Sequence, residues 1–197
     1  MSPDVGLISL FFASIFTSNI LLANFLGMCS FISVSKDFTS SNGLGLAVTF
    51  VMTITTAINW LVYHYLLIPF GLEYLRYIVF IIVIAAIVQI SEMVIERMST
   101  NLYMSLGIFL PLITVNCAIL GVALFMQIRN YNFLQSVIFG LGSGLGWWLA
   151  IISLAAIRKK VDKSPVPGPL KGPGITLITI GLMAMAFMGF SGMLNVQ

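Results

Sequence analysis

Two cysteines, Cys29 and Cys117, are the residues of this sequence best suited to redox or metal chemistry, and both lie within apolar stretches. Thiolates are the usual ligands of iron–sulfur clusters, and a [2Fe–2S] cluster normally takes four of them. Two cysteines are therefore half of such a site. A cluster held by this chain requires a second copy of the chain or a related subunit to supply the other pair.

Two other interpretations of the cysteines remain open on residue types alone. A free cysteine often behaves as a small apolar core residue. A disulfide is a further possibility, although structural disulfides belong to exposed regions in oxidising compartments rather than to apolar helices.

The segments that must position these cysteines are membrane spans. Of the 197 residues, 59% are hydrophobic and only 8% are charged, whereas soluble domains carry about 25% charged residues. About 20 apolar residues cross a bilayer. Six stretches qualify, and together they predict a single integral membrane domain over residues 1–197: Val5–Met28, Leu44–Ile68, Leu75–Ile95, Tyr103–Ile128, Phe133–Ile157 and Ile175–Leu194.

The basic residues predict the orientation. The net charge of +3 is small and the basic residues are scattered along the sequence, whereas nucleic-acid binding needs a basic face. Lys and Arg gather in cytoplasmic loops, and here they concentrate in the first, third and fifth connections, while only Arg76 and Arg129 lie in the second and fourth. With six spans, both termini are expected on the periplasmic side. The N-terminal segment has no basic region before its apolar run, so we expect it to remain as a span.

Two spans are expected to be broken, each beside a cysteine. The first apolar region continues to Val34, about 30 residues or ~45 Å as a straight helix, which exceeds the bilayer core. Gly27 is the expected break point, and Pro111 is expected to kink the fourth span. Matched breaks in spans one and four predict two inverted three-helix repeats, residues 1–98 and 99–197, with a site near the midplane.

Other polar residues are secondary candidates. Residues beside the cysteines could tune a cluster or cap broken helix ends, namely Gly27, Met28, Thr114 and Asn116, together with Asn19 and Asn24. Glu92 is either part of a solvated helix end or part of an ion path. His64, the only histidine, fits an interfacial aromatic belt. Gly140, Gly142, Gly144 and Gly146 favour close helix packing.

The cysteine motifs resemble a known family. The stretch 25–36, FLGMCSFISVSK, is very similar to the first cysteine motif of the E-type subunits of the sodium-translocating NADH:quinone reductases. Residues 106–121, LGIFLPLITVNCAILG, resemble the second motif, and the segments 142–151 and 181–192 are similar too. The resemblance covers essentially the whole chain.

This resemblance implies a six-span protein that pairs antiparallel with the homologous D subunit of the complex, beside the A, B, C and F subunits. It implies that Cys29 and Cys117 are two of the four ligands of a shared intramembrane [2Fe–2S] cluster. That cluster relays electrons from NADH toward ubiquinone while the complex exports sodium ions from the cell. FMN, FAD, riboflavin and NADH are expected on other chains of the complex only, and no catalysis is expected from this chain by itself.

Two alternatives accompany this interpretation. The A subunits of the Rnf ferredoxin:NAD⁺ oxidoreductases form a sister family, and the segment 71–76, GLEYLR, resembles them. Met28 with Ser30 around Cys29, and the pair Trp147–Trp148, favour the sodium pump. An inverted-repeat transporter without a redox cofactor is an alternative of a different class, but few charged residues lie at membrane depth to form a substrate site.

Overall fold

The computed structural model describes residues 6–98, 113, 116–165 and 172–189, and every regular element in them is helical. In chain order these elements are α1 (Leu7–Phe12), the π-turn η1 (Ala13–Thr17), α2 (Met28–Val34), α3 (Phe38–Val62), the π-turn η2 (Tyr63–Leu67), α4 (Ile68–Phe70), the 3₁₀ turn η3 (Glu73–Leu75), α5 (Arg76–Met98), α8 (Cys117–Ile128), α9 (Phe133–Val161) and α10 (Pro173–Met188).

Within the described residues, three helical stretches are long and apolar enough to cross a membrane: Phe38–Phe70, Glu73–Val94 and Phe133–Val161. Three shorter apolar helical stretches accompany them: Leu7–Thr17, Cys117–Ile128 and Pro173–Met188. The prediction of an all-helical membrane protein is confirmed for the described residues. Parts of the predicted fourth and sixth spans, Pro111 among them, lie outside those residues.

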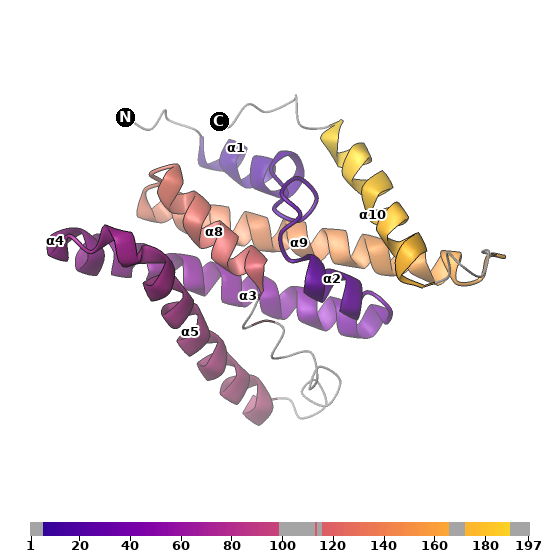
Figure 1. Cartoon of the computed structure of the whole chain (residues 1–197), viewed down its shortest axis with the longest axis horizontal. Helices are drawn as coiled ribbons and strands as arrows, with labels where there is room; N and C mark the ends of the chain where they lie inside the picture. Colours follow the sequence, from indigo (N-terminus) through magenta and orange to yellow (C-terminus); the bar gives the residue numbers. More distant parts are fainter. Residues whose placement is uncertain (1–5, 99–112, 114–115, 166–171, 190–197) are drawn as a thin grey trace.

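Helices α3 and α9 lie side by side and antiparallel at the centre of the molecule (Figure 1). At one end, the rings of Trp60 and Phe133 meet edge to face with centroids 5.3 Å apart. At the other end, Nε1 of Trp148 donates a hydrogen bond to Oδ1 of Asn42 over 3.1 Å. This pair forms the scaffold against which the shorter helices pack.

Small residues let α9 approach two neighbours at once. A Cβ on Gly140 would lie 2.8 Å from Oγ1 of Thr56, and one on Gly144 would lie 2.8 Å from Cα of Thr49, both on α3. On a second face of α9, Cβ atoms on Gly142 and Gly146 would collide with α1 and η1. The predicted close packing therefore occurs within this chain. Gly140 and Gly144 face α3, whereas Gly142 and Gly146 face α1 and η1.

The first apolar region is interrupted, as its length predicts, but the interruption is longer than expected. Helical backbone ends at Thr17 and resumes only at Met28. Asn19, which is buried, satisfies backbone groups at the start of this break. Its Nδ2 donates to the carbonyls of Ile15 and Gly146, at 3.0 and 2.9 Å, and its Oδ1 accepts from the backbone N–H groups of residues 21 and 22. Asn19 thus both caps the break and ties it to α9.

The connections group at opposite ends of the bundle. Nη1 of Arg158, near the end of α9, donates to the carbonyl of Ile32 at 3.0 Å and to Oγ of Ser35 at 2.7 Å, so the first and fifth connections lie together. At the other end, Nε1 of Trp60 donates to the carbonyl of Tyr131 at 2.9 Å, which joins the end of α3 to the loop before α9. This grouping matches the alternation that the basic residues predict.

Asp37 caps the N-terminus of α3, at the end of the bundle where Arg158 lies. Oδ2 of Asp37 accepts hydrogen bonds from the backbone N–H and the hydroxyl of Ser40, at 3.1 and 2.7 Å. These bonds hold the pKa of the Asp37 carboxyl below its ordinary value of 3.8. Because the folded pKa is depressed, the stabilisation is present above the unfolded pKa and is lost as the pH falls through the folded one.

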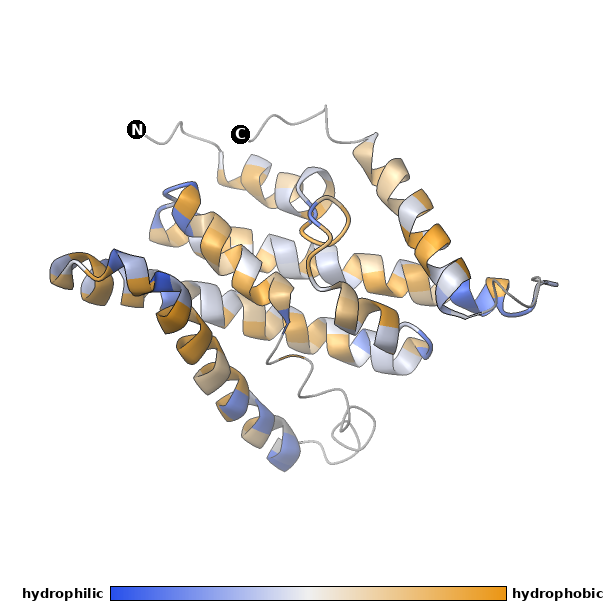
Figure 2. Ribbon diagram, in the orientation of Figure 1, coloured by the Kyte–Doolittle hydropathy of each residue, from blue (hydrophilic) through white to orange (hydrophobic). Residues whose placement is uncertain are grey.

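Apolar residues predominate in the helices (Figure 2), and many large apolar side chains are exposed on the bundle. In the span that contains α5, only 17% of the most hydrophobic 18-residue stretch is buried, against 56% of the corresponding stretch in α9. Most of α5 must therefore be covered by lipid or by another chain. Exposed large side chains on α5 and α10 include Ile78, Ile81, Ile82, Ile90, Leu177, Ile178, Leu182 and Met185.

A valine at Gly144 tests the α3–α9 contact. Gly144→Val would press its side chain into the backbone of Thr49, and overpacking of this kind costs about 1–3 kcal/mol. We expect the free energy of unfolding in mixed detergent micelles to fall by that amount. Gly181→Val is the matched control, because a Cβ there meets nothing within 4 Å. Equal losses for both variants would contradict the close contact between α3 and α9.

Candidate functional site

The two cysteines lie in the first turns of two helices, α2 and α8. Cys29 is the second residue of α2 and is exposed, whereas Cys117 is the first residue of α8 and is half-buried. Both are free thiols, so the structure contains no disulfide between them. The exposed position of Cys29 leaves its thiol accessible from outside the chain.

A hydrogen bond joins the two cysteine motifs. The backbone N–H of Gly27 donates to Sγ of Cys117 over 2.9 Å. Gly27 is the N-cap of α2 and has φ +85°, a left-handed conformation that favours glycine. Cys29 is two positions after Gly27, so their Cα atoms are at most roughly 7 Å apart. This hydrogen bond therefore brings the Gly27 turn, which precedes Cys29, against Cys117.

The turn at Gly27 is tightly enclosed. A Cβ on this residue would lie 2.7 Å from Nε1 of Trp147, 3.0 Å from Cβ of Ala118 and 3.0 Å from Oδ1 of Asn116. Glycine is thus required here twice, for its backbone conformation and for the absence of a side chain. Trp147 itself is fully buried. In the sequence, Trp147 was notable only for the family resemblance of the Trp147–Trp148 pair, and its contact with the Gly27 turn was not predicted.

Asn116 links α8 to α2. Its Oδ1 accepts from the backbone N–H of Ala118 at 3.0 Å, which caps α8, and its Nδ2 donates to Oγ of Ser30 at 3.4 Å. The Ser30 hydroxyl donates in turn to the carbonyl of Gly27 at 3.2 Å. Asn116 is buried, so these bonds satisfy polar groups that water cannot reach.

This arrangement suits negatively charged sulfur. Cys117 is the first residue of α8, so it lies at the positive end of the helix dipole. The Gly27 N–H adds a donor from a different segment. Within the described part of the chain, no group of three or more His, Cys, Asp and Glu residues is placed to hold a metal ion. The site therefore offers two sulfur ligands from this chain.

The remaining candidates have different surroundings. Met28 is half-buried and packs against the core, and Asn24 is exposed. Thr114 lies outside the described residues. Glu92 is half-buried near the C-terminal end of α5, and its carboxylate makes no hydrogen bond or ion pair with the described residues. Nothing in this geometry connects Glu92 with the cysteines.

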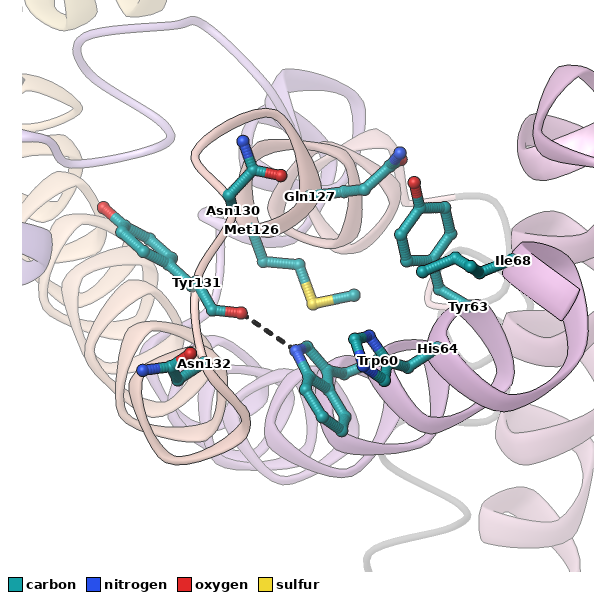
Figure 3. Close-up of a pocket in the computed structure, with 9 residues that line it drawn as sticks. All are labelled: Trp60, Tyr63, His64, Ile68, Met126, Gln127, Asn130, Tyr131 and Asn132. Carbon is teal, nitrogen blue, oxygen red and sulfur yellow. Dashed lines mark hydrogen bonds between the residues drawn. The ribbon is translucent and has the colours of Figure 1, made fainter. Parts of the chain in front are cut away.

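His64 lines a cavity of about 220 Å³ at the other end of α8 (Figure 3). Its ring stacks on Trp60 with centroids 4.8 Å apart. The sulfur of Met126 points into the space above this stack, while Tyr63 and Gln127 close one side. Cys117 begins α8 and Met126 lies nine residues on, about 14 Å along the helix. His64 is thus placed among aromatic side chains, away from the thiols.

Gly27→Ala and Gly71→Ala form a matched pair, because both glycines have positive φ, +85° and +63°. A left-handed alanine costs roughly 1–2 kcal/mol. Gly71 has open space around its Cβ position, whereas Gly27 is enclosed, so Gly27→Ala should lose about 1–3 kcal/mol more. Equilibrium unfolding of the purified protein in detergent measures both losses. A Gly27 variant no less stable than the Gly71 variant would contradict the enclosure.

Comparison with known proteins identifies the family of this chain. The family model described as "Rnf-Nqr subunit, membrane protein" matches residues 7–194. The chain is 52% identical to a protein of Chlamydia trachomatis serovar L2, over 95% of this chain and 82% of the relative. It is 53% identical to one from Pseudoalteromonas translucida and 52% identical to one from Proteus mirabilis, each over 94% of this chain and 96% of the relative. All three relatives are named as the E subunit of Na(+)-translocating NADH-quinone reductase. The chain belongs to the Rnf-Nqr family of membrane subunits.

Proposed function

We propose that this chain is a membrane subunit of a sodium-translocating NADH:quinone reductase, and that Cys29 and Cys117 supply two of four ligands to an intramembrane [2Fe–2S] cluster. The observation that carries the proposal is the Gly27 N–H donated to Sγ of Cys117, which unites the two motifs. The names of relatives more than half identical over almost the whole chain favour the sodium pump over the Rnf complex.

The donor set fits half of such a cluster. A [2Fe–2S] cluster takes four thiolates, and this chain has two cysteines. The other two come from the homologous D subunit, paired antiparallel with this chain. The exposed thiol of Cys29 is accessible to that partner, while Cys117 is fixed by Gly27. Bound there, the cluster supplies one-electron transfer at membrane depth.

The packing supports two inverted repeats, residues 1–98 and 99–197. Helix α3 of the first half packs against α8 of the second, and α9 of the second half packs against α1 and η1 of the first. The central α3–α9 pair thus contacts the first segment of each half. Cys29 and Cys117 then occupy corresponding places, each in the first turn of its helix.

In this proposal the chain spans the inner membrane of a bacterium with both termini on the periplasmic side. The joined first and fifth connections, which carry Lys36 and Arg158, face the cytoplasm. Electrons pass from NADH toward ubiquinone through this site and through flavins on other chains, among the A, B, C and F subunits. The role of this chain is to hold the ligands, to exclude water and to place N–H donors at the sulfur atoms.

Cys29→Ser and Cys117→Ser test the proposal in the purified complex. Each should remove the iron of one cluster and the corresponding EPR signal of the reduced complex, because a hydroxyl is a poor replacement for a thiolate. Ser33→Ala, an exposed position of the same helix α2, is the control and should keep both. If both cysteine variants retain full iron and an unchanged spectrum, the chain carries no cluster, and the transporter alternative gains support.

A further inference from the structure

Trp147 is the largest side chain that is fully buried in the described residues, and it lies directly against the cysteine turn. Its Nε1 would be 2.7 Å from a Cβ on Gly27. The edge of the indole therefore occupies the space that a side chain at position 27 would need. Ala118 and Asn116, at the start of α8, close the turn from other directions. The Gly27 turn is thus in contact with the indole edge on one side and with the start of α8 on the other.

The indole N–H of Trp147 differs from those of the other two tryptophans. Nε1 of Trp60 donates to the carbonyl of Tyr131, and Nε1 of Trp148 donates to Asn42. Nε1 of Trp147 is buried and has no hydrogen-bond acceptor among the described residues. A buried donor without an acceptor is unfavourable and rare in folded proteins. This N–H lies beside the turn whose backbone N–H binds Sγ of Cys117.

We propose that Trp147 is a positioning residue for the cysteine site: its indole edge holds the Gly27 turn so that the Gly27 N–H stays on Sγ of Cys117. This inference rests on the proposed function, because it concerns the same two thiols. The unpaired indole N–H also directs a positive dipole end at the turn. Trp147 acts through Gly27 and is not itself a ligand.

The expected consequence is electrostatic. N–H groups donated to cluster sulfur atoms stabilise the reduced, more negative state and so raise the reduction potential. A looser Gly27 turn lengthens the bond to Sγ of Cys117 and lowers that potential. A residue that merely fills the core would leave the potential unchanged as long as the complex assembles.

Trp147→Phe in the holo complex is the direct test, with Trp148→Phe on the same helix as the matched control. Phenylalanine keeps an aromatic ring but removes the N–H and the longer edge that meets Gly27. EPR-monitored potentiometry of the cluster should show a downward shift for Trp147→Phe and none for Trp148→Phe. If Trp147→Phe does not assemble, Trp147→Tyr, which keeps a large ring with a polar edge, is measured instead and should shift in the same direction. An unchanged potential in the assembled variant would overturn the inference.

Hydrogen exchange separates this inference from the proposed function. In the same complexes, the peptide that contains Gly27 should exchange its amide hydrogens faster in Trp147→Phe than in the parent or in Trp148→Phe. This readout does not require a cluster. Faster exchange without any signal that depends on Cys29 and Cys117 would refute the cluster and keep the positioning role. Unchanged exchange would refute the positioning role even if the cluster is present.

Discussion

Backbone that leaves the helical path inside an apolar segment must find its hydrogen-bond partners within the protein, because lipid offers none. This chain meets that requirement at both cysteine motifs with buried asparagines. Asn19 serves the break before α2, and Asn116 serves the start of α8. Between these two sites, the Gly27 N–H donates to Sγ of Cys117 and joins the two motifs.

Helix α9 contributes to almost every part of this arrangement. Its glycines admit α3 on one face and the first segment on the other, and the carbonyl of Gly146 binds Asn19. One residue further along, Trp147 encloses Gly27, and Arg158 binds the end of α2. A single straight helix therefore fixes the start of the break, its final turn and the short helix that carries Cys29.

Much of this architecture could be predicted from the sequence, because the signals were local. Apolar length predicted the helices, excess length predicted the break near Cys29, and glycine spacing predicted close packing. The length of the break could not be predicted, since the segment after Thr17 is as apolar as the helix before it, and the bond from Asn19 to the carbonyl of Gly146 joins residues far apart in the sequence. The enclosure of Gly27 by Trp147 was missed for a similar reason: it joins residues far apart in the sequence, and no periodicity reports it.

The hydrogen bonds between α9 and the first segment also determine when during translation that segment can reach its final structure. Asn19 is bonded to a carbonyl 127 residues later, and Ile32 to a guanidinium 126 residues later. At a translation rate of about 5–20 residues per second, the segment that contains Asn19 and α2 is synthesised roughly 6–25 s before these partners on α9. The final geometry of the segment that carries Cys29 is thus a late event of biogenesis, because it must wait for the synthesis of α9.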